Sequence, residues 1–270
     1  MQGASRESYA AARAELDGLT DSAALATAAD EILSVGALLA REPRLRRALS
    51  DPARTGEERS ALLLGLVGEQ IGQTARQLLG TLVAGRWSSP SELRDGVDRL
   101  GVEALIVSAD RADELGEVED ELFRFGQIVS GDPALAASIG DSTATVARRD
   151  ELIDLLLAGK AKPASVVLVK QAVRTFGGRS FAGALTRLVE LCAEERDRSV
   201  AYVTVAEPLS DAEEERLGAA LAERYGRQVA VKVTVDPSVL GGARVRIGSD
   251  LYDGTVARRL AEARNALASR

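Results

Sequence analysis

The residue types that carry most protein chemistry are scarce in this chain of 270 residues. It has no histidine, which excludes a Ser-His-Asp triad, imidazole acid–base catalysis and a histidine-ligated zinc ion. Its one cysteine, Cys192, excludes an intramolecular disulfide and any multi-cysteine metal site. Cys192 lies on an apolar helical face beside Leu188, which is typical of a buried structural thiol. The sequence therefore offers few routes to catalysis.

Three further motifs could in principle bind a phosphate or a cation, but each has a simpler structural explanation. Gly159-Lys160 resembles the end of a Walker loop, yet Ala161 stands where that loop needs Ser or Thr. Gly241-Gly242 belongs to no G-x-G-x-x-G run, and we expect this pair to adopt positive φ between two strands. Glu213 begins a run of three glutamates in the first turn of a helix, where the helix dipole favours anions. We predict no catalytic, cofactor or metal site.

Charge and hydropathy narrow the classes of function further. The chain has 34 basic and 41 acidic side chains, a formal net charge of −7. Residues 1–110 carry 12 basic and 16 acidic side chains, residues 111–198 carry 12 and 15, and residues 199–270 carry 10 and 10. No part is basic, so nucleic acid is not an expected partner. We also expect no membrane span, because no run of about 18 apolar residues occurs, and no signal peptide, because residues 1–7 have no basic head followed by an apolar stretch. The simplest interpretation is a soluble protein of a reducing compartment.

The first 198 residues have the pattern of closely packed helices. Hydrophobic residues make up 46% of the chain and aromatic residues only 3%, so the cores must be largely aliphatic. Apolar positions recur at i, i+3, i+4 and i+7, as they do on one face of an α-helix. Pro43, Asp51-Pro52 and Pro90 separate the periodic stretches. We predict helices around 9–16 and over 22–40, 45–49, 56–67, 72–86 and 88–105 or beyond.

An internal repeat divides this helical part. Residues 31–83 align without a gap with residues 121–173, and 11 of the 53 pairs are identical, against roughly five expected by chance. The identities include residues that begin or separate helices, such as Pro43 with Pro133 and Thr55 with Thr145. We predict two successive helical bundles related by an internal duplication of about 90 residues.

After residue 198 the hydrophobic period changes from 3.6 to 2. Val229, Val231, Val233 and Val235 alternate along a strand, and we predict further strands over about 200–206 and 244–248. A capping box of Ser210 and Glu213 starts a helix to about residue 225, and Asp253 caps a final helix. The predicted fold is mainly α, with helical bundles at 1–110 and 111–198 and a small α+β domain at 199–270, whose first two strands are parallel.

The C-terminal motifs resemble those of a known family. The run from Val235-Asp236-Pro237 through Gly241-Gly242, followed by a strand and Asp253-Gly254-Thr255-Val256, resembles the signature of the delta subunit of F-type ATP synthases, which is related to the oligomycin-sensitivity-conferral protein. Ala206-Glu207-Pro208-Leu209 and Tyr9-Ala10 resemble two other motifs of that family. Thr255 replaces the usual Ser, and the chain has one helical bundle more than ordinary members. Lengthened forms of this kind are similar to those of high-GC Gram-positive bacteria.

The resemblance implies a non-catalytic peripheral-stalk (stator) subunit for proton-driven ATP synthesis. In the family, a helical bundle binds the N-terminal helices of alpha subunits, and the C-terminal domain binds b-type peripheral-stalk subunits, so that the catalytic head does not rotate. It further implies a hetero-oligomeric complex, no cofactor, no membrane span of its own and a peripheral location at the cytoplasmic face of the cell membrane. The alternative is a generic helical adaptor or scaffold.

Two sets of residues are candidates for these contacts. Residues of two predicted helices would line a groove for an alpha-subunit helix, although the same pattern also fits the core of a bundle; they are Tyr9, Ala12, Arg13, Leu16, Ala75, Leu78, Leu79, Leu82 and Val83. The family signature would shape turns near the stalk-binding surface; its residues are Val235, Asp236, Pro237, Gly241, Gly242 and Asp253. Which bundle meets the head stays open, because Leu168 and Val169 of the second bundle form a similar stripe.

Overall fold

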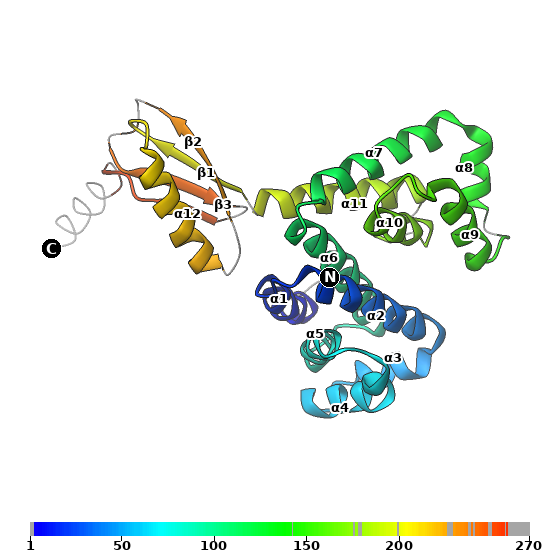
Figure 1. The fold of residues 1–270 in the computed structure, drawn as a ribbon. Coiled ribbons are helices and arrows are strands. Elements are labelled where there is room, and N and C mark those ends of the chain that lie inside the picture. The colour runs from blue at the N-terminus through cyan, green and yellow to red at the C-terminus, as the bar shows by residue number, and fades with distance from the viewer. Residues whose placement is uncertain are drawn as a thin grey trace. The chain divides into compact units, whose positions relative to one another are not determined.

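The computed structural model describes residues 3–141, 143–174, 176–177, 180–198, 200–225, 229–236, 239, 241–247, 250–256 and 258 (Figure 1). The chain divides into two compact units, residues 1–192 and 193–270, with the boundary inside a helix. The first unit is helical and the second combines a helix with a four-stranded sheet. This confirms the mainly α class with a small α+β domain. The predicted division of the helical part at residue 110 stays a prediction.

Six helices form the first half of the helical unit: α1 (Ala4–Asp17), α2 (Ser22–Arg41), α3 (Pro43–Leu49), α4 (Gly56–Val67), α5 (Gln73–Ala84) and α6 (Pro90–Arg111), with the short 3₁₀ helix η1 (Gly68–Gln70) after α4. Their ends agree with local sequence signals. The Asp21 side chain accepts hydrogen bonds from the first turn of α2, and Thr55 and Glu58 form a capping box at α4. Pro43 and Pro90 occupy first-turn positions, where the missing N–H costs no helical hydrogen bond.

The second half repeats this order with α7 (Leu115–Gly131), α8 (Pro133–Gly140), α9 (Val146–Leu157), α10 (Pro163–Val173) and α11 (Phe181–Arg198). Hydrogen bonds recur at positions 90 residues apart. The Glu31 carboxylate accepts from the Gly72 N–H at 2.9 Å, and the Glu121 carboxylate accepts from the Lys162 N–H at 2.9 Å. The duplication is therefore visible in the polar contacts that tie α2 to α5 and α7 to α10.

A second recurring contact joins α4 to the end of α5 and α9 to the end of α10. Arg59 donates from Nε to the carbonyl of Val83 at 3.2 Å, and Arg149 donates to the carbonyl of Val173 at 3.3 Å. Both pairs again differ by 90 residues. Each repeat thus uses one arginine to hold α4 against α5 or α9 against α10.

Helix α6 belongs to both repeats. It packs on α1 and α2 in the first half and on α7 and α10 in the second. In the second repeat it therefore has the position that α1 has beside α5 in the first. Residues 100–109 are buried at ten consecutive positions, which a surface helix with one apolar stripe never shows. The two repeats share this helix and form one compact unit.

The second unit contains β1 (Val200–Val205), α12 (Asp211–Tyr225), β2 (Ala230–Val235), β3 (Ala243–Ile247) and β4 (Asp250–Asp253). The strand order is β2-β1-β3-β4; β1 and β2 are parallel, as predicted, and the other pairs are antiparallel. Ala201, Val203 and Val205 of β1 are buried with Leu221 of α12 in a core of their own. Since alternate side chains point to opposite faces, the other residues of these strands form a second face.

Strand β4, the final helix and helix α2 differ from the prediction or lie beyond it. Strand β4 was not predicted, because four residues give too short a pattern to show a period. The predicted final helix lies largely outside the described residues. Helix α2 is long and apolar enough to cross a membrane by length and composition, which was not predicted because polar residues interrupt its apolar stretches. In this structure its apolar face packs into the core of the first unit, with Leu25, Ile32 and Leu39 fully buried.

Candidate docking surfaces

The residues proposed for the helix groove all lie in the core of the first unit. None is more than 7% exposed, and Ala12, Leu16 and the five residues of α5 have no exposed surface. The structure does bring the groove residues of α1 and those of α5 together, because α1 packs directly on α5. These side chains therefore fix the spacing of the two helices, while their assignment as partner contacts stays a prediction.

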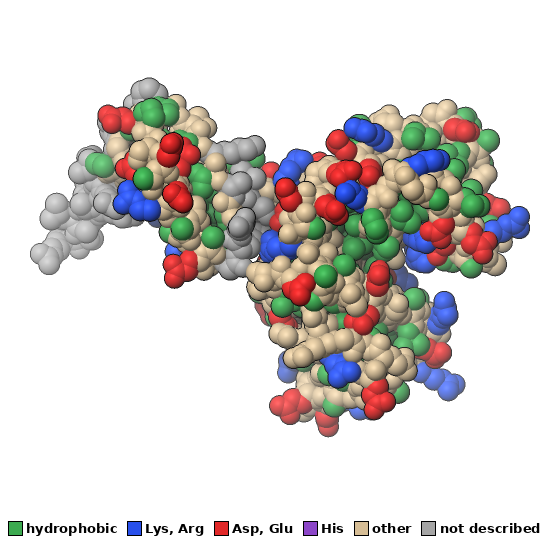
Figure 2. Space-filling view, viewed as in Figure 1, with side chains coloured by type: hydrophobic (Ala, Val, Ile, Leu, Met, Phe, Trp, Pro, Cys, Tyr) green, Lys and Arg blue, Asp and Glu red, His purple; other side chains and the backbone are tan. Residues whose placement is uncertain are grey.

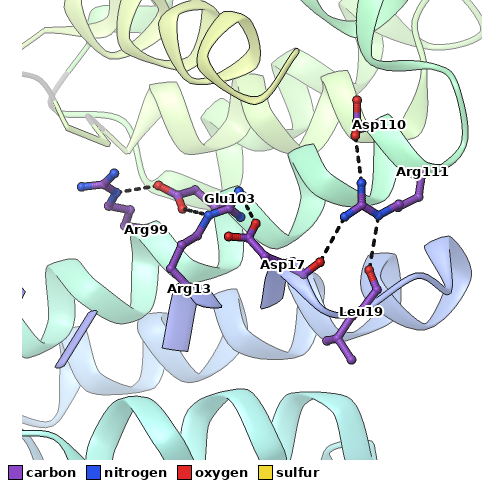
Figure 3. Close-up of polar contacts among 7 residues, drawn as sticks. All are labelled: Arg13, Asp17, Leu19, Arg99, Glu103, Asp110 and Arg111. Carbon is purple, nitrogen blue, oxygen red and sulfur yellow. Dashed lines mark hydrogen bonds and ion pairs between the residues drawn. The ribbon is translucent and has the colours of Figure 1, made fainter. Parts of the chain in front are cut away.

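A cluster of buried charges holds α1 on α6 (Figure 3). The Glu103 carboxylate pairs with Arg99 at 2.7 Å and with Arg13 at 3.2 Å, and Arg13 also pairs with Asp17 at 3.0 Å. The side chains of Arg13 and Glu103 are only 8% and 6% exposed. Removing one partner of such a pair leaves an uncompensated buried charge. The packing of α1 on α6 therefore depends strongly on Arg13 and Glu103.

Tyr9 lies at the edge of the same cluster. The Arg99 guanidinium stacks over its ring at 4.7 Å from the centroid. Burial raises the pKa of the Tyr9 hydroxyl well above its ordinary value, and the nearby Glu103 carboxylate raises it further. Tyr9 thus stays neutral and serves as a packing residue whose cation–π contact adds to the attachment of α1.

The end of α6 also fixes the connection between α1 and α2. Arg111 donates to the carbonyls of Asp17 and Leu19 (Figure 3). The Ser108 hydroxyl donates to the carbonyl of Ser22 at 2.7 Å. Because α6 is shared by both repeats, these contacts tie the first helix of the chain to the centre of the unit. Helix α1 and its connection to α2 are therefore held in place by α6 from the inner side.

The outward-facing residues of α1 and α5 are small or polar. Ala10, Ala11 and Ala14 are exposed on α1, and Gln77 of α5 donates to the Glu15 carboxylate across the boundary between the helices. A cavity of about 190 Å³ lies at one end of this boundary, lined by the connection from Gly18 to Asp21 and by Thr74. The sequence pattern did not indicate these residues, because exposed alanines give no signal distinct from that of an ordinary solvated helix face.

The family-signature residues shape turns in the second unit. Gly241 and Gly242 have φ of +68° and +78°, as predicted, and a Cβ at Gly242 would lie 2.5 Å from the carbonyl oxygen of Gly254. Val235 ends β2 and is 44% exposed, and the Asp236 N–H donates to the carbonyl of Val205 at 2.8 Å. Pro237 lies outside the described residues.

Asp253 and Thr255 form the last turn that the structure describes. The Asp253 carboxylate accepts from both the N–H and the hydroxyl of Thr255, which lowers the pKa of Asp253. The Thr255 hydroxyl in turn accepts from the N–H of Arg258. The bond from Arg258 gives Thr255 the capping position, so the prediction that Asp253 is the cap is wrong by two residues: Asp253 ends β4 and holds the Thr255 hydroxyl.

The residues that the sequence offered as possible phosphate, cation or nucleophile sites pack in the core or end and begin helices. Cys192 is fully buried, as predicted. Gly159 follows α9 with φ of +65°, and the Lys160 ammonium donates to the carbonyl of Leu156, which satisfies the end of that helix. The Glu213 carboxylate accepts from the N–H of Ser210 at 2.9 Å, which is one half of the predicted capping box; the Ser210 hydroxyl also donates to this carboxylate, and the Glu213 N–H donates to the Ser210 carbonyl.

Charges are mixed over the first unit. In the face drawn in Figure 2, basic and acidic side chains are interspersed across this unit, with no continuous area of one sign. Such a surface does not have the basic stripe that binding to a phosphate backbone requires. The chain thus combines a helical unit and a small sheet unit, each with its own hydrophobic core.

Comparisons with known proteins give the family. Residues 102–267 match the model of the ATP synthase delta (OSCP) subunit. The chain is 61% identical over its full length to ATP synthase subunit delta of Salinispora arenicola, covering all of that protein, and 49% identical to that of Streptomyces avermitilis, covering 99% of this chain and 98% of that one. The chain belongs to the ATP synthase delta (OSCP) subunit family. It is a structural subunit, not a catalytic one, of a hetero-oligomeric, membrane-associated ATP synthase complex.

The family match begins inside α6 and covers the second repeat and the sheet unit, so α1 to α5 lie before it. A chain in the cryo-EM structure of the Toxoplasma gondii mitochondrial ATP synthase hexamer covers 62% of this chain at 20% identity, with a TM-score of 0.34 that is too low to compare the folds. Membership in the family sets aside the alternative of a generic adaptor.

Proposed function

We propose that this chain is a stator subunit that joins the N-terminal helices of alpha subunits to the b-type peripheral stalk. Its two units have separate hydrophobic cores, so each can offer its own attachment surface, and this is the observation that carries the proposal. Holding the head against the rotor requires two simultaneous attachments to one chain. In this role the chain is peripheral to the cytoplasmic face of the cell membrane through the complex.

The first unit takes the alpha-subunit helix in the groove between α1 and α5. In helix-in-groove binding, the apolar face of a partner helix packs between two helices of the receptor. Exposed Ala10, Ala11 and Ala14 allow a partner helix to approach α1 closely. The corresponding helix of the second repeat, α6, is buried at every position from 100 to 109 and has no comparable free face there. This contrast favours the first repeat.

The second repeat is the alternative docking place, and one observation favours it: the family model covers that repeat and not the first. Its groove would use the outer side of α10, where Val166 and Val167 are half-buried. A substitution on each surface separates the two possibilities.

The test is proton-driven ATP synthesis by membranes stripped of this subunit and rebuilt with variants of the full chain. Ala14→Glu should lower synthesis at least fivefold while the head still hydrolyses ATP, because hydrolysis needs no stator. Ala147→Glu, the same change at an exposed position of α9, should have no effect. If Val167→Glu uncouples the complex and Ala14→Glu does not, the second repeat binds the head. If membranes without the chain synthesise ATP normally, the stator function is wrong.

A further inference from the structure

The sheet of the second unit has one face that α12 does not occupy. Helix α12 lies against the opposite face, where Gly218 approaches Val231. The strand register aligns Tyr202 of β1 with Arg246 of β3, and Thr204 with Arg244. Arg246 in turn lies opposite Leu251 of β4. Arg244, Arg246 and Leu251 are exposed on this face, and Leu251 is 57% exposed.

The two arginines differ in what holds them. Arg244 pairs with Asp253 across the strands at 3.6 Å, with half of the Arg244 side chain still exposed. The Arg246 guanidinium stacks over the Tyr202 ring at 4.6 Å from the centroid, and the described residues give it no carboxylate partner. Stacking holds the guanidinium against the ring, and the Arg246 side chain is exposed. That arrangement is suited to a fork-like contact with a carboxylate.

We propose that this face docks an acidic segment of the stalk subunit, with carboxylates on Arg246 and Arg244 and apolar contacts on Tyr202 and Leu251. The inference rests on the proposed stator function and identifies the chemistry of its second attachment. Charge complementarity supports the occupant, since among the described residues Arg246 has no carboxylate partner and Arg244 shares its exposed side chain with Asp253 alone, which favours an anionic partner. The chain's own residues 259–270 do not have that character, because they contain three arginines and one glutamate.

An open sheet with an aromatic residue and arginines can also bind single-stranded nucleic acid. Residues 199–270 have 10 basic and 10 acidic side chains, however, so this unit has no excess positive charge to neutralise a phosphate backbone. The acidic peptide is therefore the occupant that the observations favour.

The experiment measures binding of the full chain to the soluble part of the b-type stalk subunit encoded with it, at low and at physiological salt. Arg246→Glu should weaken binding at least tenfold at low salt and reduce the salt dependence. Arg216→Glu, the same charge change at an exposed position of α12, should alter binding less than twofold. Tyr202→Leu keeps the charge but removes the stacking, and should weaken binding about threefold.

The binding results distinguish a failure of the proposed docking face from a failure of the stator function. Equal binding by the Arg246→Glu and Arg216→Glu variants would overturn this inference and leave the stator function standing. Failure of the unaltered chain to bind the stalk segment would overturn both. Binding of a single-stranded oligonucleotide in its place, lost in the Arg246→Glu variant, would assign the face to nucleic acid and also overturn the inference. If Arg246→Glu melts at a lower temperature than the unaltered chain, Arg246→Gln provides the same comparison without a reversed charge.

Discussion

The two helical repeats have the same order of helices and share two polar contacts, but they differ in packing. Arg59 of the first repeat is 4% exposed and donates to the carbonyls of five residues: Asp51, Arg54, Val83, Ala84 and Gly85. Its counterpart Arg149 is half-buried, and its Nε is buried without a hydrogen-bond partner. At another paired position, Leu33 is 9% exposed whereas Phe123 is 56% exposed.

The difference shows that duplication preserved the positions of hydrogen-bonding residues while their environments diverged. In the first repeat Leu33 lies against Gly101 of the shared helix α6. In the second, the corresponding helix α7 leaves Phe123 and Ile128 exposed. Because a buried polar group that loses its partner costs far more than an exposed one, equivalent substitutions should be costlier in the first repeat.

The largest contrast should come from ion pairs. Replacing Glu103 with Ala removes the carboxylate that balances Arg13, and we expect the free energy of unfolding to fall by about 3 to 5 kcal/mol. Asp120 of α7 forms an i, i+4 pair with Arg124, with side chains 69% and 75% exposed, so Asp120→Ala should cost less than about 0.5 kcal/mol. Urea unfolding followed by circular dichroism measures both. Similar losses in the two variants would contradict the difference in burial.

Arg59 and Arg149 provide the next contrast. Arg59→Met leaves several carbonyls at the end of α5 without donors and should lower the free energy of unfolding by about 3 kcal/mol. Arg149→Met should lower it by about 1 kcal/mol, since that side chain makes one such bond. The same denaturation measurement applies, and a larger loss for Arg149→Met would show that the second repeat depends more on this contact.

Asp98 of the shared helix should give a pH dependence. Burial raises its pKa to about 6; Arg94 and Arg174 oppose this shift and Asp95 adds to it. The folded protein therefore holds a proton that the unfolded chain releases near pH 4, so the free energy of unfolding should fall as pH rises from about 4 to 6. Asp98→Asn should remove this slope, a change of about 1 to 2 kcal/mol. Parallel curves for the two proteins between pH 4 and pH 7 would contradict the assignment.

The smallest contrast concerns helix caps. Thr55 forms a full capping box with Glu58, whereas the residue three positions after Thr145 is Arg148, which cannot return a hydrogen bond as an acceptor. We expect Thr55→Ala to cost about 1 kcal/mol and Thr145→Ala about 0.5 kcal/mol. Thermal melting of the two single variants measures the difference. Equal shifts would show that the reciprocal bond from Glu58 adds nothing measurable.

Much of the fold could be predicted because helix periodicity and caps are local signals. The bounds of α4 agree with the prediction residue for residue, and the repeat was visible from residues such as Thr55 and Thr145. The sharing of α6 between repeats could not be predicted, since its pattern fits a core helix of either one. Strand β4 was too short to show a period.

The docking surfaces were harder to predict than the fold. Tyr9 and Leu16 fit a groove wall and a bundle core equally well, because both structures require one apolar helical stripe. The structure buries both side chains where α1 packs on α5 and α6, and their role as partner contacts stays a prediction. The role of Arg246 could not be predicted either, because an arginine at an alternating position of a strand has the pattern of an ordinary solvent-facing residue. Its stacking on Tyr202 follows only from the register of β1 and β3.

The most direct test of the stator account is a sequential titration of the full chain with its two proposed partners. The chain is first saturated with a peptide of the alpha-subunit N-terminal helix, and the soluble stalk segment is then added. We predict that the stalk segment binds with its Kd unchanged within twofold, that Ala14→Glu abolishes only peptide binding and that Arg246→Glu weakens only stalk binding. Displacement of the peptide by the stalk segment, or loss of both partners in either folded variant, would contradict the existence of two independent attachments.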